Sequence, residues 1–278
     1  MGEYQCNKYS KKMNANSVIT LTFGDQAENH AGMETLGHLS EPGQGFNYQD
    51  LLSAKEKLEQ DGFTSQLIQL ELYDSIDNIN HEIDIPEEAY VLIIKDGVNK
   101  LLEPFQQDHK SMFNEQSNLE LDKKAWMRGR VVNKHARWNL CFDTQRREPN
   151  YEKKQGRIVS YDDIPITKLL VEQFEKYFGP KATNLKGEGN YYYDTSKCGI
   201  GFHGDSERRK VIAVRLGASM SLHYQWFVNS EPVGERIIIP LNGGDMYVMS
   251  EKAVGTDWKK KKIYTLRHAT GAGPYIKL

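Results

Sequence analysis

The sequence has few cysteines and no long apolar run. Three of its 278 residues are cysteines, and they lie far apart, at Cys6, Cys141 and Cys198. A disulfide framework or a cysteine zinc site needs paired cysteines at short spacing, which argues against both. No stretch of about 18 apolar residues could span a bilayer, and no basic segment followed by an apolar one marks a secretory signal. We therefore expect a soluble intracellular protein, cytoplasmic or nuclear and not secreted, with reduced thiols and no membrane association.

Charge is distributed unevenly along the chain. Residues 1–120 contain 8 Lys and Arg against 21 Asp and Glu, whereas residues 121–278 contain 28 against 17. The total of −2 therefore conceals an acidic amino-terminal part and a basic carboxy-terminal part. A basic domain favours a polyanionic partner such as nucleic acid, although two halves of opposite charge can also dock on each other.

The first hundred residues combine a polar leader with short apolar patterns. Residues 1–45 are rich in Asn, Gly, Ser and Glu and show little apolar periodicity, which predicts a mobile leader without chemistry. Apolar residues at three- and four-residue steps over 48–72 predict a helix that is broken near Asp61-Gly62. The runs 90–94 and 98–102 flank Lys-Asp-Gly and predict a hairpin.

The last hundred residues follow a strand pattern. A helix is predicted before them over 164–178, because Asp163 can cap it, Pro165 suits its first turn and Gly179 follows its apolar stripe. Many short β-branched and aromatic runs without intervening helices are then typical of a sandwich or double-sheet barrel. The fold is thus expected to be mainly β with flanking helices. The predicted strands are 190–194, 211–216, 221–228, 235–241, 245–250, 263–269 and 275–278.

A histidine and a carboxylate lie two positions apart in the segment Gly-Phe-His-Gly-Asp, residues 201–205. On an extended chain His203 and Asp205 can point the same way, so both can reach one cation. Such pairs also occur by chance, and most histidines are ordinary surface or core residues. The pair alone is a weak signal, and a metal site needs a further ligand.

His268, in a later predicted strand, can supply the third ligand. A facial triad of two histidines and one carboxylate leaves three coordination positions open for oxygen and a co-substrate, as in non-haem iron(II) oxygenases. The adjacent Arg267 points to the opposite face of an extended strand, so we assign it a salt bridge outside the core. The remaining histidines show no ligand spacing and are expected at the surface or in the core: His30, His38, His81, His109, His135 and His223.

The region around these residues resembles the core of AlkB-like 2-oxoglutarate/iron(II)-dependent dioxygenases. The segment Asn-Tyr-Tyr-Tyr-Asp (190–194) precedes the His-x-Asp, Glu207 follows it by two positions, and the apolar strand after it ends in Gly217. Residues 241–249, Leu-Asn-Gly-Gly-Asp-Met-Tyr-Val-Met, resemble the family's strand before the distal histidine. The similarity covers about the last 90 residues in a consistent order. It implies a double-stranded β-helix (jelly-roll) catalytic core with iron(II) held by His203, Asp205 and His268.

The resemblance also implies a site for 2-oxoglutarate. Asn190 and Tyr192 match the Asn-x-Tyr that hydrogen-bonds this co-substrate in the family. Because three tyrosines follow one another, Tyr193 is an alternative to Tyr192. A structural strand with aromatic packing would give the same pattern.

The anchor for the distal carboxylate of 2-oxoglutarate departs from the family. The family's arginines follow the distal histidine, yet this chain ends ten residues after His268 and offers only Lys277 there. Arg215 is the other candidate, because an unpaired charge in an apolar strand requires an anionic partner. That partner is either the co-substrate or a buried carboxylate of the protein.

Residues 128–140, upstream of the predicted strands, form a basic and aromatic segment. This segment resembles the region where AlkB-like enzymes place a nucleotide-recognition lid. A solvated basic loop with one buried tryptophan is an equally good interpretation. The lysine run 259–262 is most simply a solvated turn, but it can contact phosphate beside the basic residues after Glu207 if the fold gathers them. The substrate-binding candidates are Arg128, Arg130, Arg137, Trp138, Arg208 and Arg209.

The predicted organisation is a mobile leader (1–45), an acidic region of helices and strands (46–120) and a jelly-roll oxygenase domain (121–278). The predicted function is oxidative demethylation or hydroxylation of a nucleic-acid base, with iron(II) and 2-oxoglutarate as cofactors. One alternative is an oxygenase that hydroxylates a protein or a small molecule. Another is a non-catalytic jelly-roll module that binds nucleic acid, although such a module has no need of three convergent metal ligands.

Overall fold

The computed structural model describes residues 13–72 and 85–278, and their fold is mainly β, with 37% strand and 22% helix. The strands in these ranges form an eight-stranded sheet, a four-stranded sheet and two two-stranded hairpins. This confirms the expected class, a mainly β fold with flanking helices. His81 and residues 1–12 of the expected leader lie outside the described residues.

The large sheet has the strand order β4-β5-β15-β12-β1-β10-β8-β9, and its neighbours are antiparallel except for β8 and β9. In this order its strands are β4 (Thr64–Gln69), β5 (Tyr90–Lys95), β15 (Met246–Met249), β12 (Val211–Gly217), β1 (Val18–Gly24), β10 (Lys186–Tyr192), β8 (Trp138–Asp143) and β9 (Ile158–Ser160).

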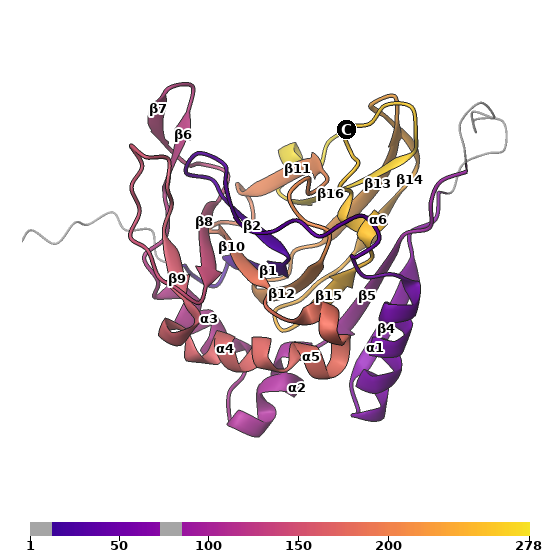
Figure 1. The fold of residues 1–278 in the computed structure, drawn as a ribbon, viewed down its shortest axis with the longest axis horizontal. Coiled ribbons are helices and arrows are strands. Elements are labelled where there is room, and N and C mark those ends of the chain that lie inside the picture. Colours follow the sequence, from indigo (N-terminus) through magenta and orange to yellow (C-terminus); the bar gives the residue numbers. More distant parts are fainter. Residues whose placement is uncertain (1–12, 73–84) are drawn as a thin grey trace, which may run out of the picture.

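The small sheet has the order β11-β16-β13-β14, and two further strand pairs form hairpins, one of which projects at the upper left of Figure 1. The strands of the small sheet are β11 (Gly199–His203), β16 (Thr265–Gly271), β13 (Leu222–Val228) and β14 (Glu231–Ile239). The hairpins are β2 (Gln26–Asn29) with β3 (Glu34–Gly37), and β6 (Lys124–Met127) with β7 (Arg130–Asn133).

Five helices cover the face of the large sheet that is turned away from the small sheet, and they lie along the lower side of the molecule in Figure 1. These helices are α1 (Tyr48–Gln60), α2 (Gly97–Leu102), α3 (His109–Ser117), α4 (Pro165–Glu172) and α5 (Phe174–Phe178). The short helix α6 (Glu251–Val254) lies on the other side, beside the small sheet, and its Ala253 and Val254 belong to the cluster between the sheets. Single 3-10 turns lie at Glu103–Phe105, Tyr161–Asp163, Pro180–Ala182 and Gly273–Tyr275.

Side chains of the central strands point alternately to the two faces of the large sheet and so form two hydrophobic clusters, one on each face. On β12, Ile212 and Val214 pack with the helices, whereas Val211 and Ala213 pack in a second cluster with the small sheet. Because side chains alternate along a strand, Arg215 belongs to the same face as Val211 and Ala213, between the two sheets. The space between the sheets is therefore where polar side chains of the large sheet can meet those of the small one.

The prediction of a mobile leader over residues 1–45 is wrong for the part of it that the structure describes, residues 13–45. Strand β1 lies in the middle of the large sheet, paired antiparallel with β10 on one side and β12 on the other. Its Ile19, Leu21 and Phe23 are fully buried, so a seven-residue alternation of apolar and polar residues outweighs the polar composition around it. Since β4 and β5 extend the same sheet, the three predicted segments contribute to one sheet rather than to separate units.

Two further predictions before residue 103 are corrected in part or in whole. The helix predicted over 48–72 forms up to Gln60 and breaks near Asp61-Gly62 as predicted, where Gly62 adopts a φ of +80°, but the part beyond the break is the strand β4 and not a helix. The predicted hairpin around Asp96-Gly97 is absent from the described fold. Asp96 has a φ of +51°, and Gly97 begins α2 instead of a return strand. Both segments had apolar spacings that suit either a helix or a strand.

The other elements follow the prediction closely, with one exception at the carboxyl end. Most predicted strands beyond residue 190 form within a few residues of their expected bounds, and the helix predicted over 164–178 is split into α4 and α5. Residues 275–278 form no strand, because the chain turns at Gly273–Tyr275. None of the helices in the described ranges has the length and apolar character required to cross a bilayer.

Candidate metal centre

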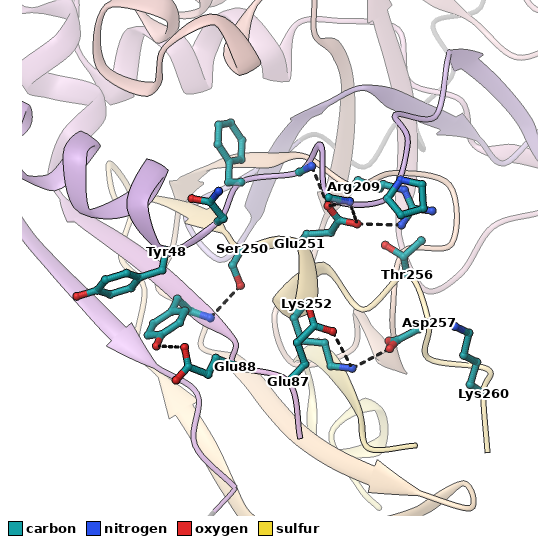
Figure 2. A pocket seen from close by; sticks show the side chains of 16 residues that line it. Tyr48, Glu87, Glu88, Arg209, Ser250, Glu251, Lys252, Thr256, Asp257 and Lys260 are labelled. Carbon is teal, nitrogen blue, oxygen red and sulfur yellow. Dashed lines mark hydrogen bonds and ion pairs between the residues drawn. The ribbon is translucent and has the colours of Figure 1, made fainter. Parts of the chain in front are cut away.

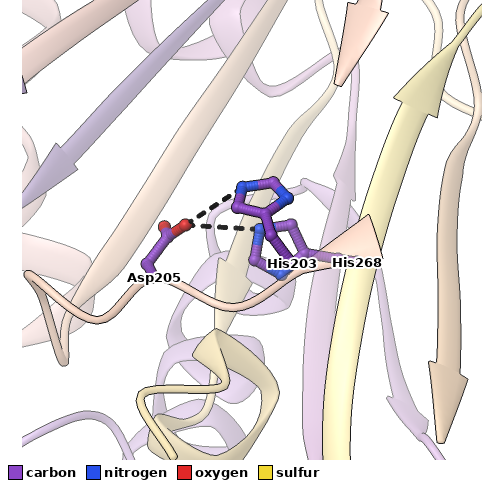
Figure 3. Close-up of side chains that lie close together, drawn as sticks. All are labelled: His203, Asp205 and His268. Atoms are coloured by element: carbon purple, nitrogen blue, oxygen red, sulfur yellow. Dashed lines mark ion pairs between the residues drawn. The ribbon is translucent and has the colours of Figure 1, made fainter. Parts of the chain in front are cut away.

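Three candidate metal ligands converge between the two sheets (Figure 3). His203 is the last residue of β11, Asp205 follows in the loop, and His268 lies on β16. Strands β11 and β16 pair antiparallel with His203 opposite His268, which brings residues 65 positions apart in the sequence next to each other. The strand register therefore assembles the set that the sequence predicted.

The spacing of the ligand atoms suits one metal ion. Asp205 Oδ1 lies 3.4 Å from His203 Nε2 and 3.6 Å from His268 Nε2, and one ligand atom from each residue lies within 4.8 Å of the other two. Metal–nitrogen and metal–oxygen bonds of about 2.1 Å place neighbouring ligands of one ion about 3 Å apart. Among the described residues, no second group of three or more such side chains has this geometry.

The histidine rings are oriented for binding through Nε2. His203 Nδ1 lies 2.8 Å from the carbonyl oxygen of Gly201, which turns Nε2 toward Asp205. His268 is 8% exposed, and its Nδ1 has no hydrogen-bond partner within the described part of the chain. Burial and the nearby His203 lower the pKa of His268, which keeps its imidazole neutral, the form that binds metal.

A buried arginine holds the charge of the third ligand. Burial alone would raise the pKa of Asp205, but Arg208 and the two histidines hold it well below the usual range. Arg208 Nε lies 3.5 Å from Asp205, and Arg208 Nη2 contacts Glu188 and Glu207. The backbone N–H of Asp205 also donates to Val254 O at 3.0 Å. The carboxylate is thus fixed in place and ionised.

The three ligands line a cavity of about 920 Å³ that is bounded by both sheets. Thr20 on β1, Asn190 on β10 and Arg215 on β12 line it from the large sheet, and His268 on β16 lines it from the small sheet. The β6–β7 hairpin adds Trp126, and the loop after α6 adds Trp258. A volume of this size accommodates a small co-substrate and part of a larger substrate.

Arg215 brings an unpaired charge into this cavity. The residue is 0% exposed, and its Nη1 donates to Thr20 Oγ1 at 2.6 Å. Its Nε and Nη2 have no hydrogen-bond partner, and no carboxylate of residues 13–72 or 85–278 forms an ion pair with it. Because a buried, unpaired guanidinium is costly, these free N–H groups favour an anionic ligand. The alternative of a buried structural ion pair is not what the structure shows.

Two tyrosines lie beside Arg215 in the cavity lining. Burial raises the pKa of Tyr192 against the opposing charges of Arg137 and Arg215, and it raises the pKa of Tyr247 to about 12 against Arg215. Both phenols therefore remain protonated hydrogen-bond donors at neutral pH. Tyr193, the alternative to Tyr192, stacks on Trp138 and donates to His135 O at 2.7 Å, outside the cavity lining.

The side chain of Asn190 already has partners. It accepts a hydrogen bond from Arg137 Nε at 2.7 Å and donates to Glu188 at 3.0 Å. Although Asn190 lines the cavity, this geometry makes it a support for Arg137. Its expected contact with 2-oxoglutarate stays a prediction.

The other candidates for co-substrate and substrate binding are dispersed. Lys277 is exposed after the last turn and does not line the cavity. Arg267 does not line it either; its guanidinium lies 4.0 Å from the ring centre of Phe227, and the predicted salt bridge is wrong for the described residues, among which Arg267 forms no ion pair. Trp138 is 6% exposed and stacked on Tyr193, so its position supports packing rather than substrate contact.

Arg128 and Arg130 are exposed at the tip of the β6–β7 hairpin. Of the basic residues predicted to bind substrate, Arg137 and Arg208 line the cavity.

Arg209 points into a different depression of about 700 Å³ (Figure 2). Its Nε donates to Ser40 O at 2.8 Å and its Nη1 contacts Glu251 at 3.1 Å. Lys252, in the same depression, is bound to Asp257 at 2.7 Å. Both cations are engaged by the protein, so the expected phosphate contact of Arg209 is not what its surroundings favour. Arg208 is likewise engaged by carboxylates, inside the main cavity wall.

Sequence reasoning missed several cavity residues. Thr20 and Glu28 come from the segment that was expected to be a leader, and Tyr247 was noted only as part of a motif. The alternation of β1, with threonines at positions 20 and 22 between apolar residues, was the available signal. Lys134 also lines the cavity, and nothing in the local sequence distinguishes it from other lysines of the hairpin.

Comparison with known proteins identifies a viral relative. The chain is 48% identical over 260 residues to an uncharacterized protein, R156, of Acanthamoeba polyphaga mimivirus, and the match covers 94% of this chain and 98% of the viral one. The chain belongs to the family of this viral protein. No protein-family model matches the sequence. The match spans nearly the whole of both chains, so the similarity is not confined to one motif.

In this family member, Glu28 gives the cavity a titratable group outside the triad. Burial and the nearby carboxylates of Glu207 and Glu188 raise the pKa of Glu28 from 4.5 to about 7. A carboxyl whose pKa is raised by folding favours the folded state when it is protonated. Its contribution is complete below about pH 4.5 and is lost as the pH rises through about 7.

Glu28→Gln is therefore expected to stabilise the metal-free protein at pH 8 by about 1–2 kcal/mol, allowing for partial exposure, and to change little at pH 4.5. Urea unfolding at the two pH values, with a chelator present, measures the difference. Glu56→Gln, an exposed position on α1, is the control and should show no such pH dependence. Equal effects of Glu28→Gln at both pH values would contradict the assignment.

Proposed function

We propose that this protein is an iron(II)/2-oxoglutarate-dependent dioxygenase that acts on a nucleic-acid base by oxidative demethylation or hydroxylation. One observation carries the proposal: His203, Asp205 and His268 share a cavity with the unpaired, fully buried Arg215. A metal triad with open positions and a separate anion anchor are the two elements that such a reaction needs. The resemblance of residues 190–249 to AlkB-like enzymes supports the same reading.

The order of the strands supports a jelly-roll core. From β10 to β16 the chain passes between the large and small sheets, with β10, β12 and β15 in one and β11, β13, β14 and β16 in the other. The next strand of this series would return to the large sheet between β10 and β12, and that place is taken by β1. The amino-terminal strand β1 thus completes the large sheet between β10 and β12.

The residues present fit iron(II) and 2-oxoglutarate. Two imidazoles and one carboxylate form the donor set of a facial triad, and the free N–H groups of Arg215 suit the far carboxylate of a dicarboxylic acid. When bound, iron and 2-oxoglutarate supply oxygen activation coupled to oxidative decarboxylation, which yields succinate and an oxidised substrate. With an N-methyl substrate, the hydroxymethyl product releases formaldehyde.

Some side chains of the protein position the candidate metal ligands, and others bind the co-substrate. Arg208 keeps Asp205 ionised, and the Gly201 carbonyl orients His203. Arg215 binds the anionic end of the co-substrate, held in position by Thr20 and assisted by the phenol of Tyr247. Between the sheets these groups replace water around the co-substrate, so their charges act in a medium of low dielectric constant.

The rim of the cavity supports a base as the substrate. Trp126 and Trp258 line it and offer flat aromatic surfaces, on which a base can stack once it leaves the helix. Arg137, Lys134 and Lys259 line the same cavity, and Arg128 lies on the adjoining hairpin. Stacking surfaces together with cations favour a nucleotide over an apolar small molecule.

Arg215→Leu is expected to raise the KM for 2-oxoglutarate about 10- to 100-fold, the loss typical of hydrogen bonds to a charged group. Iron affinity should stay unchanged, because Arg215 does not contact the triad. Thermal stability should not fall, because the unliganded protein leaves this charge unpaired. The measurement is succinate formation at varied 2-oxoglutarate, with calorimetric titration of iron(II).

Two threonines of β1 provide a matched comparison. Thr20→Val removes the hydroxyl that holds Arg215 and should raise the same KM by a smaller factor, about 3- to 10-fold, while Thr20→Ser restores it. Thr22→Val removes a hydroxyl from the same face of the strand that makes no hydrogen bond to Arg215, and should leave the KM unchanged. An unchanged KM in Arg215→Leu would place the anion anchor elsewhere.

Substrate class is tested by assaying methylated single- and double-stranded DNA and RNA for formaldehyde and for altered bases. The proposal predicts release of formaldehyde from at least one of them, in proportion to succinate. Succinate formation that no nucleic acid accelerates would instead favour hydroxylation of a protein or small molecule. Nucleic-acid binding without any turnover of 2-oxoglutarate would favour the non-catalytic module.

A further inference from the structure

Two cations converge on the hairpin side of the cavity without anionic partners of their own. Lys134 follows β7 and Arg137 precedes β8, and both line the cavity. The amine of Lys134 is buried and has no hydrogen-bond partner within the described part of the chain. Burial is the main cause that lowers the pKa of Lys134 to about 8, attraction by Asp122 opposes it, and repulsion by Arg137 acts in the same direction as burial. Lys134 and Arg137 lie three residues apart in the segment that joins β7 to β8.

Arg137 is prepared for binding rather than neutralised. Its Nε donates to Asn190 Oδ1 at 2.7 Å, a neutral acceptor, which orients the guanidinium and leaves its two Nη groups without a partner among the described residues. His30 also lines this part of the cavity, and burial, with Arg137, lowers its pKa to about 3. A neutral His30 adds a hydrogen-bonding group without adding charge.

The nearby carboxylates are committed to other partners. Glu188 contacts Arg208 and accepts hydrogen bonds from the amides of Asn139 and Asn190. Asp122 accepts from the Tyr151 hydroxyl at 2.8 Å and from the backbone N–H of Arg157 at 2.7 Å. Neither forms an ion pair with Lys134 or Arg137 in the described ranges. Within residues 13–72 and 85–278 neither cation has a carboxylate at ion-pair distance, so a ligand can supply the counter-anion.

We propose that Lys134 and Arg137 form a subsite for a phosphate group of the substrate, separate from the co-substrate anchor at Arg215. This inference rests on the proposed function, since it makes the substrate a nucleotide that enters with its phosphate on the hairpin side. A phosphate carries up to two charges and several acceptor oxygens, so one group can bind both cations at once. Trp126, on β6 of the same hairpin, lies on the cavity wall where the attached base can stack.

Calorimetric titration of the full-length protein tests the subsite without turnover. The four deoxynucleoside 5′-monophosphates are compared with the corresponding deoxynucleosides and with inorganic phosphate. We expect at least one monophosphate to bind about 10-fold or more tightly than its nucleoside, because two charged hydrogen-bonding groups hold the phosphate. Lys134→Met should remove most of this advantage and Lys134→Arg should retain it. Equal binding of monophosphate and nucleoside to the parent protein would overturn the proposal.

Lys124→Met is the matched control, because Lys124 is an exposed cation of β6 on the same hairpin that does not line the cavity. It should leave the phosphate advantage unchanged, and an equal loss in Lys124→Met would mean a diffuse charge effect and no subsite. Circular dichroism confirms that each variant is folded. A phosphate advantage without succinate formation would sustain the subsite and refute the dioxygenase, whereas succinate formation without the advantage would do the reverse.

Discussion

Asp205→Ala is expected to lower the affinity for iron(II) by at least about 100-fold and to abolish turnover of 2-oxoglutarate. Asp205 is the carboxylate that lies within 3.6 Å of the Nε2 atoms of both histidines, and its pKa is held well below the usual range, so it supplies the negative charge of the triad. Loss of a group that only orients a ligand costs 10- to 100-fold, and loss of a ligand should cost more. Anaerobic titration and succinate formation measure the two effects.

Glu207→Gln provides the control for Asp205→Ala. Glu207 lies two positions further along the chain, lines the same cavity and contacts the same Arg208, but does not belong to the triad. Its replacement should leave iron affinity within about 3-fold of the parent, well inside the range of outer groups. Iron affinity that falls equally in both variants, or in neither, would exclude Asp205 as a ligand.

Arg208→Leu is expected to lower the free energy of unfolding by about 3–5 kcal/mol, the range for removal of one partner of a buried ion pair. Arg208 is 3% exposed and contacts Glu188, Glu207 and Asp205. Without it these carboxylates lose their shared cation in a wall shielded from water. A large part of the loss should be recovered below about pH 5, where carboxylic acids take up protons.

Arg209→Leu is the control for Arg208→Leu, because it removes a neighbouring arginine that is also paired with a glutamate but is less buried. Arg209 also contacts a glutamate, Glu251, but its side chain and that of Glu251 are partly exposed, and it lies outside the main cavity. An ion pair of this kind contributes up to about 1 kcal/mol, so the change in urea midpoint should be small. If the two variants unfold at the same urea concentration, Arg208 has no special role in the cavity wall.

The metal site was accessible to sequence reasoning because its ligands lie on or next to strands with clear patterns. His203 and Asp205 are local in sequence, and the strands after them have strong β-branched and aromatic runs. The pairing of His203 with His268 then follows from strand order rather than from any local feature. The strands themselves were predictable because their own residues specify them.

The end of the cavity at Arg215 was less accessible to sequence reasoning, because it depends on the position of β1. Its seven residues pair with β10 and β12, about 170 and 190 positions away, and no local pattern specifies those partners. Thr20 and Arg215 are therefore neighbours only in the folded chain, and the choice between Arg215 and Lys277 could not be made beforehand. Lys134 and Glu28 are ordinary in sequence and become distinctive only through burial.

The most direct test of the account is formation of succinate from 2-oxoglutarate by the purified protein reconstituted anaerobically with iron(II) and then exposed to oxygen. The account predicts one iron per chain and succinate that requires iron, 2-oxoglutarate and oxygen together, and it predicts loss of this activity in His203→Ala. A protein that binds one iron per chain yet forms no succinate, or a His203→Ala variant as active as the parent, would contradict it.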